Sequence, residues 1–235
     1  MTLKEINLGA NAIDGETLLE LTIALVGIRS LKRLNLHGLH HVTANGWRPV
    51  LDALGSSPNS ALDDLKLDIN NIDDEGAVSF ASALAGNNTL KVIDLDSTGI
   101  SNVGRQAFSR LVCDKKSIMN TFSSNSTLYQ ICDSDGSSNF NEDLPLSLYL
   151  NQGSNKNDVV RHKILWAYFQ GNSVDLKEFL GMGLKVMPRA FAWADRDYTG
   201  HSLLYQLLWT MPSLMELYHD HEPRAGGKKR KLAFK

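Results

Sequence analysis

The chain has 235 residues, of which 43% are hydrophobic and 21% are charged. These values are typical of globular domains and exclude an intrinsically disordered chain, and no apolar run reaches the length of a membrane span. The net charge of −2 conceals an asymmetry, because six Lys or Arg residues and no acids lie between Arg224 and Lys235, which leaves −8 on residues 1–223.

Four segments in the first half of the chain repeat one pattern, L-x-x-L-x-L-x-x-N-x-L. They begin at Leu3, Leu31, Leu62 and Leu90, so their starts lie 28, 31 and 28 residues apart. The asparagine position of the four segments holds, in order, Asn11, His40, Asn70 and Thr98, and the second segment contains one extra residue. Self-similarity at this period indicates an architecture of stacked repeats.

Each repeat combines a strand pattern with a helix pattern. Alternate side chains of a short strand point to opposite faces, so Leu65 enters a core while Asp64 and Lys66 point away. After each strand, apolar residues four apart predict a helix with one buried face. These pairs are Leu21 and Leu25, Val50 and Leu54, Phe80 and Leu84, and Phe108 and Val112, with Asp73, Asp74 and Ser101 as candidate helix caps. We therefore predict an α/β solenoid of right-handed strand–helix coils, with a parallel sheet inside and helices outside.

This pattern, the period of about 28 residues and the string NNIDDEGAVSFASALAGNNTL resemble leucine-rich repeats of the ribonuclease-inhibitor type. The resemblance covers residues 3–128. The arrangement of repeats, helical region and basic tail is also similar to uncharacterised leucine-rich-repeat proteins of microbial eukaryotes. The resemblance implies the fold but no activity, because the same coil serves inhibitors, GTPase-activating proteins, ubiquitin-ligase substrate receptors and immune sensors.

The composition divides the chain into four parts. We assign residues 1–132 to the solenoid, with four full repeats and a degenerate fifth whose strand begins at Ile118. Residues 133–157 are rich in Asp, Asn, Ser and Gly and predict a linker that bears a short helix. Helical periodicity over residues 158–221 predicts a helical cap or small domain, since the terminal coil of a solenoid needs a cover. Residues 222–235 predict a disordered basic tail.

The first repeat begins in the middle of its motif. Leu3 is already the first consensus leucine, so no N-terminal cap precedes the first coil. An uncapped parallel edge strand promotes pairing with other chains. The expectation is that the sequence is a fragment of a longer protein, with cover by a partner or a second copy as the alternative.

The solvent-facing positions of the four strands form a polar, mainly acidic strip on the predicted inner arc. Polar residues are required at any solvated strand face, but carboxylates on a concave surface also steer and orient a basic protein partner. We therefore predict a protein-binding surface in which Asp64, Asp68, Asp94 and Asp96 contribute most. The full set is Arg33, Asn35, His37, Asp64, Lys66, Asp68, Asp94 and Asp96.

No motif for catalysis or cofactor binding is recognised in the sequence. Carboxylates on an open arc lack the apolar pocket that separates the pKa values of an acid and a base. His37, His40 and His41 lack a cysteine or a close carboxylate to complete a zinc site. The segment DRDYTG from Asp195 imitates a calcium loop, but Gln206 replaces its bidentate glutamate. We predict no catalytic residue, no metal and no cofactor.

The tail contains the run KKRK, formed by Lys228, Lys229, Arg230 and Lys231. It looks like a nuclear-import signal, and such runs also contact nucleic-acid phosphates nonspecifically. Two cysteines are too few for a disulfide scaffold, and the N-terminus lacks a secretory signal. We therefore expect an intracellular protein, cytoplasmic or nuclear, with no membrane partner.

The function predicted from these features is a non-enzymatic protein–protein interaction module that holds an unidentified protein, with a basic surface, on the acidic concave face. Two alternatives remain open. One is a regulator of a small GTPase, by analogy with GTPase-activating proteins built from repeats of this length, although the basic tail weakens that analogy. The other is a nuclear protein whose basic tail touches nucleic acid.

Overall fold

The computed structural model of the chain describes residues 2–57, 60–132, 143–153 and 155–168. The chain divides into two compact units, Met1–Ala167 and Tyr168–Lys235, and the first contains the repeats. The helices predicted beyond residue 168, the DRDYTG segment and the basic tail lie outside the described residues.

The first unit alternates strands and helices along the chain. In order, the elements are β1 (Glu5–Asn7), α1 (Gly15–Val26), β2 (Arg33–Asn35), α2 (Ala44–Ser56), β3 (Asp64–Lys66), α3 (Asp74–Ala83), the 3-10 turn η1 (Leu84–Gly86), β4 (Val92–Asp94), α4 (Asn102–Val112), α5 (Ile118–Ser123), β5 (Gln130–Cys132), α6 (Asp143–Leu150) and α7 (Lys156–Tyr168).

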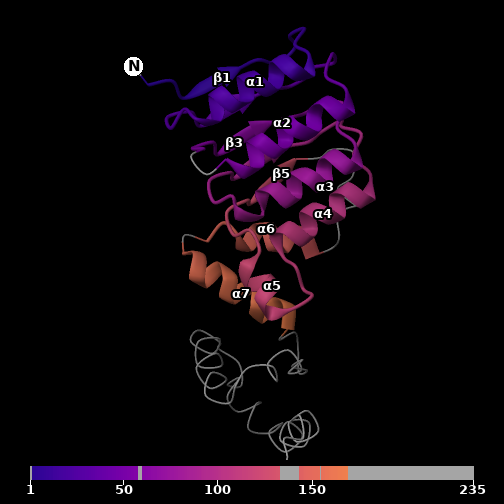
Figure 1. Ribbon diagram of the computed structural model, residues 1–235. Coiled ribbons are helices and arrows are strands. Elements are labelled where there is room, and N and C mark those ends of the chain that lie inside the picture. Colours follow the sequence, from indigo (N-terminus) through magenta and orange to yellow (C-terminus); the bar gives the residue numbers. More distant parts are fainter. Residues whose placement is uncertain (1, 58–59, 133–142, 154, 169–235) are drawn as a thin grey trace, which may run out of the picture. The chain divides into compact units, whose positions relative to one another are not determined.

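The strands form one parallel sheet in the order β1-β2-β3-β4-β5. Parallel neighbours require a crossover connection, and here α1, α2 and α3 make the first three links, whereas α4 and α5 together make the fourth. Figure 1 shows α1 to α4 following one another in chain order along one side of the sheet. The predicted coil of strand, turn, helix and turn is therefore confirmed, and the α/β solenoid fold with it.

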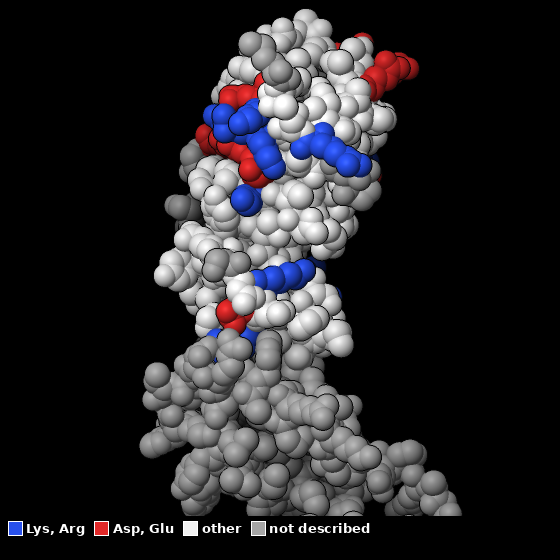
Figure 2. Space-filling model, turned by 90° about the vertical axis from the view of Figure 1, so that its left-hand side faces the viewer, with Lys and Arg blue, Asp and Glu red and all other residues white. Residues whose placement is uncertain are grey.

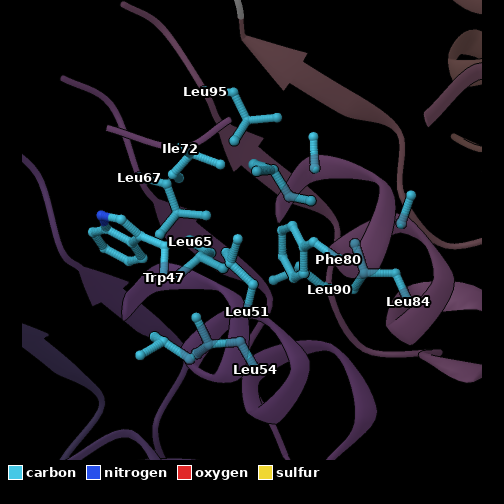
Figure 3. Packing of buried hydrophobic residues seen from close by; sticks show 14 of the residues in the cluster. Trp47, Leu51, Leu54, Leu65, Leu67, Ile72, Phe80, Leu84, Leu90 and Leu95 are labelled. Carbon is cyan, nitrogen blue, oxygen red and sulfur yellow. The ribbon is translucent and has the colours of Figure 1, made fainter. Parts of the chain in front are cut away.

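The core lies between the sheet and the helices. The second residue of each strand points into it, from Ile6 in β1 through Leu34, Leu65 and Ile93 to Ile131 in β5. Figure 3 shows Trp47 and Leu51 of α2 beside Leu65 and Leu67, with Phe80 of α3 close by. Each fully buried side chain of this size contributes about 2 kcal/mol. The apolar stripe of each helix therefore holds its coil to the neighbouring coils.

One predicted helix face is wrong. Leu21 of α1 is 37% exposed, whereas the buried residues of this helix are Leu18, Thr22 and Val26. These three residues are also four apart, so they form a competing stripe that faces α2. Within the described part of the chain no coil lies on the other side of α1, which leaves Leu21 in solvent. The other predicted pairs are buried, in α2, in α4 and, for Phe80 and Leu84, in α3 and η1.

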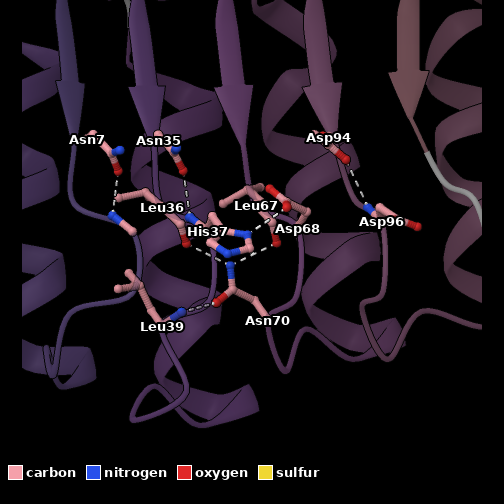
Figure 4. Close-up of polar contacts among 11 residues, drawn as sticks. Asn7, Asn35, Leu36, His37, Leu39, Leu67, Asp68, Asn70, Asp94 and Asp96 are labelled. Atoms are coloured by element: carbon pink, nitrogen blue, oxygen red, sulfur yellow. Dashed lines mark hydrogen bonds and ion pairs between the residues drawn. The ribbon is translucent and has the colours of Figure 1, made fainter.

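The turn after each strand uses a left-handed backbone. The residues with positive φ are Ala10, Gly38, Ile69 and Ser97, at φ values of 56°, 62°, 55° and 52°. Each lies at the same place in its coil, immediately before the asparagine position. The turn leaves backbone groups unpaired, and Asn70 repairs this by donating to the carbonyls of Leu36 and Leu67, both at 2.8 Å, and accepting the N–H of Leu39 at 2.8 Å (Figure 4).

The expectation for His40 is wrong, because Leu39 occupies the asparagine position of the second coil. Gly38 has the left-handed conformation that precedes this position, and Leu39 follows it fully buried. His40 is exposed. The extra residue of the second repeat therefore lies after the asparagine position, whereas the predicted alignment places it before that position.

A polar residue caps the N-terminus of each of the first four helices. The side chains of Asp14, Thr43, Asp73 and Ser101 accept backbone N–H groups at the starts of α1 to α4. Asp74 has another role, since its carboxylate accepts the backbone N–H and the hydroxyl of Ser101 at 2.7 and 2.6 Å, and the N–H of Gly104 at 3.1 Å. It therefore joins α3 to the start of the next helix.

The fifth coil differs from the prediction. The segment at Ile118 forms the short helix α5, and the fifth strand is β5, twelve residues later. Leu128 holds the position of Leu90, which it follows by 38 residues, and Ile131 pairs with Ile93. The insertion that carries α5 broke the 28-residue period on which the prediction depended.

A second set of asparagines, Asn87, Asn125 and Asn151, connects the last coils at the turns that follow the helices. Asn125 is 4% exposed and donates to the carbonyls of Leu84 and Asn87 at 3.0 and 2.9 Å. Asn151, which follows α6, donates in the same manner to the carbonyls of Asn125 and Leu128 at 3.1 and 2.6 Å. The structure thus packs α6 and Asn151, both within the predicted linker, onto the last coil.

Lys163 of α7 also contacts the last coil. Its side chain is 0% exposed, and its ammonium donates to the carbonyls of Val112 and Asn125 at 2.6 and 2.8 Å. Burial lowers the pKa of Lys163 to about 7, against a smaller opposing effect of Cys113. Lys115 stacks over the ring of Trp166 at 3.8 Å. In this part of the chain, polar side chains are buried beside apolar ones such as Leu144 and Val160.

Candidate protein-binding surface

The sheet face opposite the helices brings the predicted site residues into three rows. The strand register gives the first row as Glu5, Arg33, Asp64, Val92 and Gln130, and the second as Asn7, Asn35, Lys66, Asp94 and Cys132. Backbone bonds across the turns give the third row as Gly9, His37, Asp68 and Asp96. We call the eight predicted residues in these rows the strand-face strip.

The strip is electrically balanced at its β1–β2 end. Arg33 donates through Nε and Nη2 to Glu5 Oε2 at 2.9 and 2.8 Å, and both side chains are more than half exposed. This bond to Glu5, with a smaller contribution from Asp64, raises the pKa of Arg33. An ion pair so exposed adds little stability. It does, however, balance the charges of the side chains that β1 and β2 present on this face.

His37 and Asp68 form the pair at the centre of the strip. His37 Nδ1 lies 2.7 Å from Asp68 Oδ2 (Figure 4). The other carboxylate oxygen of Asp68, Oδ1, is buried and has no hydrogen-bond partner among the described residues. The backbone N–H of His37 donates to Asn35 Oδ1 at 2.9 Å, which fixes the turn that carries the imidazole. Asn35 thus holds the turn that carries His37, and His37 in turn contacts Asp68.

Carboxylates crowd the β3–β4 end of the strip. Asp94 Oδ1 accepts the N–H of Asp96 at 3.2 Å, as Asn35 Oδ1 accepts that of His37 two coils earlier. Burial raises the pKa of Asp94, and the negative charges of Asp68 and Asp96 add to the effect, while the hydrogen bond from the Asp96 N–H and the charge of Lys66 oppose it. A positive charge placed here from outside would relieve this repulsion. The excess negative charge of the strip is therefore local to its third and fourth strands.

The remaining predictions concern metals, membranes and the tail. Among the described residues, no group of three or more His, Cys, Asp or Glu side chains is placed to hold a metal ion. Cys113 and Cys132 do not form a disulfide bond. Within the same residues, no helix is long and apolar enough to cross a lipid bilayer. The import signal at residues 228–231 lies outside the part of the chain that the structure describes.

The sequence did not predict a polar pocket at the N-terminal ends of β4 and β5. Its volume is about 600 Å³, and Lys91, Tyr129, Asn151 and Lys156 are among the residues that line it. One signal was available, because lysine directly follows the first leucine of three repeats, at Lys4, Lys32 and Lys91. Figure 2 shows charged side chains of both signs gathered over the upper coils, and isolated charges on the lower described surface.

Comparison with known proteins identifies the repeats. A family model for the Leucine Rich repeat matches residues 59–81 and 86–109, which include β3 with most of α3 and β4 with most of α4. The fold of the chain is a leucine-rich-repeat solenoid. A solved structure, leiomodin-1 actin-binding site 2, is similar at 20% identity, covering 69% of this chain and 86% of that chain with a TM-score of 0.46. No curated protein sequence matches the chain.

Proposed function

We propose that the chain is a non-enzymatic protein-interaction module whose concave strand-face strip holds a basic segment of a protein partner. The observation that carries this proposal is the crowding of Asp68, Asp94 and Asp96 at the ends of the neighbouring strands β3 and β4, with burial and mutual repulsion raising the pKa of Asp94. Carboxylates held together on a rigid sheet are preorganised for a cation, so binding requires little rearrangement.

The strand geometry sets the spacing that a partner must match. Neighbouring strands lie about 5 Å apart, so carboxylates on β3 and β4 are separated by roughly that distance. Side chains two residues apart in an extended peptide lie about 7 Å from each other on one face. An extended segment with lysine or arginine at alternate positions therefore suits the strip, with Lys66 restricting where the basic side chains lie.

The test uses a defined peptide rather than a cell extract. A fluorescent peptide with four lysines, each separated by glycine, is titrated with the full chain at low salt, and anisotropy is measured. We expect the triple variant Asp68→Asn, Asp94→Asn, Asp96→Asn to bind at least about tenfold more weakly, since each interaction with a charged group contributes on the order of 1 kcal/mol or more. Asparagine keeps the size of each side chain.

A matched control is Glu20→Gln, which removes an exposed charge from α1, far from the strip in the fold. The control is expected to bind as the natural chain does. Equal binding by the triple variant and the natural chain, with both folded by circular dichroism, contradicts the proposal. Weakening of the natural complex by added salt is expected as well, because exposed charges are screened.

Two finer assignments rest on less direct support. We infer that the repeats are of the ribonuclease-inhibitor type, because the first four coils carry full helices of 12, 13, 10 and 11 residues. We keep the intracellular location, cytoplasmic or nuclear, as a proposal supported by the basic run at residues 228–231. Replacing that run by alanine in a fluorescent fusion should shift the protein from nucleus to cytoplasm, and an unchanged distribution would exclude import through it.

A further inference from the structure

The first coil of the solenoid has an open side, because β1 is the edge strand of the sheet in the part of the chain that the structure describes. Ile6 points into the core from β1 but is only partly buried, whereas Leu34, Leu65 and Ile93 at the same place in the next three strands are at most 1% exposed. Leu3, just before β1, is 47% exposed. Apolar surface that the middle coils bury is therefore left in solvent here.

Helix α1 shows the same difference. Leu21 is the seventh residue after the capping residue, the place that Val50, Phe80 and Phe108 hold in the next three helices. These three side chains are at most 1% exposed, against 37% for Leu21. The ring of Phe108 shows what covers this place in a middle coil, because it contacts Phe80 of the preceding helix. At Leu21 the described chain supplies no such neighbour.

The spacing on the open side of α1 differs from that between the described helices. The third residue after the cap is Gly46, Gly76 and Gly104 in α2, α3 and α4, but it is Thr17 in α1. A Cβ at Gly104 would lie 2.9 Å from the Cβ of Ala77 in α3, so glycine permits the close approach of the preceding helix. Thr17 carries a Cβ at this place and is exposed. A helix on the open side of α1 must therefore lie further away than the middle helices do from each other.

Two carboxylates mark one end of the open side. In the third coil, Asp73 and Glu75 both form ion pairs with Arg48 of the preceding helix, whose Nη2 lies 3.1 Å from Asp73 Oδ2. The same places in the first coil, the cap and the second residue after it, hold Asp14 and Glu16. Both are exposed, and neither forms an ion pair within the described residues. The first coil therefore offers these carboxylates to a cation of a neighbouring molecule.

The cations of the same coil lie at its other end. Lys4 precedes β1 and Arg29 follows α1, whereas Asp14 and Glu16 lie where the chain passes from the strand to the helix. A twofold axis perpendicular to the sheet reverses a second copy end to end, so Lys4 and Arg29 of each copy lie beside the carboxylates of the other. The open side is thus complementary in charge to itself, as an interface between two identical chains requires.

We propose that two copies of the chain associate through their first coils, with β1 of one copy paired antiparallel to β1 of the other and the two α1 helices side by side. The N–H of Leu8 donates to the carbonyl of Asn35 at 2.8 Å, so the backbone of Ile6, two residues earlier, faces β2 as well. Glu5 and Asn7 face the partner copy. Glu5 of each copy then pairs with Asn7 of the other, and the two Ile6 side chains meet at the axis.

This pairing covers the open side with matching groups. It gives the edge strand a hydrogen-bonded neighbour, buries Ile6 and Leu21, and joins the two sheets into one. The wider spacing at Thr17 is available because no turn of a coil connects the two α1 helices. The strand-face strip takes no part in the contact, so the association does not depend on the proposed function.

The molar mass of the full chain tests the association, by sedimentation velocity and light scattering over a hundredfold range of concentration. We expect it to rise from 26.0 kDa to twice that value as the concentration increases. Amide hydrogen exchange should be slower at Glu5 and Asn7 in the concentrated sample than in the dilute one, because both N–H groups become paired. A chain that stays monomeric at every concentration overturns the proposal and leaves the open side for a different protein.

Charge reversal tests the orientation of the second copy. Glu16→Lys reverses a charge at the acidic end, and the double variant Lys4→Glu, Arg29→Glu reverses the basic end, so each is expected to weaken its own dimer at least about tenfold. An equimolar mixture of the two should dimerise about as tightly as the natural chain, since each end then meets an opposite charge. Variants that dimerise unchanged would place the dimer on another surface, and a mixture that stays monomeric would exclude the antiparallel arrangement; either result overturns the proposal.

Three further variants complete the test. Lys116→Glu reverses an exposed charge outside the first coil and should dimerise as the natural chain does; if it weakens the dimer as much as Glu16→Lys does, the effect is one of net charge and the proposal is wrong. Leu21→Gln should weaken the dimer and leave the circular dichroism of the chain unchanged, because its side chain is already 37% exposed. The triple aspartate variant of the strand-face strip should dimerise normally, so failure of this proposal is distinguishable from failure of the proposed function.

Discussion

The middle coils of the solenoid and its C-terminal end close the same core by different means. Between β2 and β4 the core is closed by apolar side chains such as Leu65, Trp47 and Phe80. At the end, Asn125, Asn151 and Lys163 are buried beside the last apolar side chains. Turn carbonyls of a middle coil also receive a side-chain donor, as those of Leu36 and Leu67 do from Asn70, but at the end a buried ammonium, that of Lys163, is added to the amides.

This difference predicts how each region responds to substitution and to pH. Apolar packing has no titrating group, so the stability that it contributes should change little between pH 6 and pH 9. A buried lysine couples the other region directly to proton concentration. The four predictions below test whether the two regions differ in this way, beginning with the largest expected effect.

Phe108→Ala should destabilise the chain most, by about 4 kcal/mol, because it removes a fully buried ring and leaves a cavity. The ring of Phe108 contacts that of Phe80 edge-to-face, with centroids 6.2 Å apart. Chemical denaturation monitored by circular dichroism measures the free energy of unfolding. Phe108→Leu, which fills most of the space, should lose less than half as much. The loss should be the same at pH 6 and pH 9, and a pH-dependent loss would contradict the comparison.

Lys163 should make the stability of the chain rise with pH. Its pKa is lowered to about 7 by burial, from a usual value of 10.5, so between these values the unfolded chain binds more protons than the folded one. The free energy of unfolding therefore increases as pH rises from about 7 toward 10.5, by up to about 1.4 kcal/mol per unit, and is constant in this respect below 7.

Comparison with Lys163→Met isolates this contribution from other titrating groups. The difference in unfolding free energy between the natural chain and Lys163→Met should change by about 2 to 3 kcal/mol from pH 7 to pH 9, in favour of the natural chain at the higher pH. Denaturation at four pH values measures it. A difference that stays constant over this range would show that Lys163 keeps its proton in the folded state.

Alanine substitution should separate the two sets of asparagines. Asn125→Ala removes four hydrogen bonds of a buried amide and should cost about 3 kcal/mol, whereas Asn70→Ala removes three and should cost about 2 kcal/mol. Urea denaturation compares them. Amide hydrogen exchange of α7 should rise in the Asn125 variant and stay unchanged in the Asn70 variant; the reverse pattern would disprove a special role of Asn125 at the end.

Ile69→Gly should give the smallest effect, a gain of about 0.5 kcal/mol. A β-branched residue in the left-handed region is strained by about 1 to 2 kcal/mol, and glycine removes this strain at a smaller entropic cost. Gly38→Ala at the equivalent turn is the matched control and should lose about 1 kcal/mol, since a Cβ there meets no atom closer than 3.7 Å and only the backbone resists. Thermal melting measures the stability of both variants. If Ile69→Gly lowers the stability, the backbone of this turn is not strained in the natural chain.

The sequence predicted the coils wherever apolar residues recur with the period of the fold. The strands of the first four repeats and the buried faces of α2, α3 and α4 follow from leucine spacing, because each position has the same surroundings in every coil. The prediction was wrong at α1, where two apolar stripes compete and only the packing of α2 selects between them. It was also wrong at β5, because an inserted helix displaces the strand without altering the local pattern.

The residues of the strand-face strip could be predicted from the alternation of inward and outward side chains along each strand. The ion pairs among them could not be predicted. Nothing in the sequence shows that Arg33 pairs with Glu5, or that His37 pairs with Asp68, because both contacts join residues about 30 positions apart. The polar pocket was missed for a related reason. Lys91 and Lys156 are isolated residues in the sequence, and only the packing of α6 and α7 on the last coil brings them together.

The bonds of Asn125 have a consequence for the biosynthesis of the chain. Asn125, Ser126 and Thr127 form the acceptor sequence for N-linked glycans, and the atom that would carry the sugar is Nδ2. In the folded chain this atom donates to the carbonyls of Leu84 and Asn87 at 3.0 and 2.9 Å. An oligosaccharide at Asn125 and a closed fourth coil therefore exclude each other. A sugar attached there in a secretory host would mark chains that were modified before the coil closed.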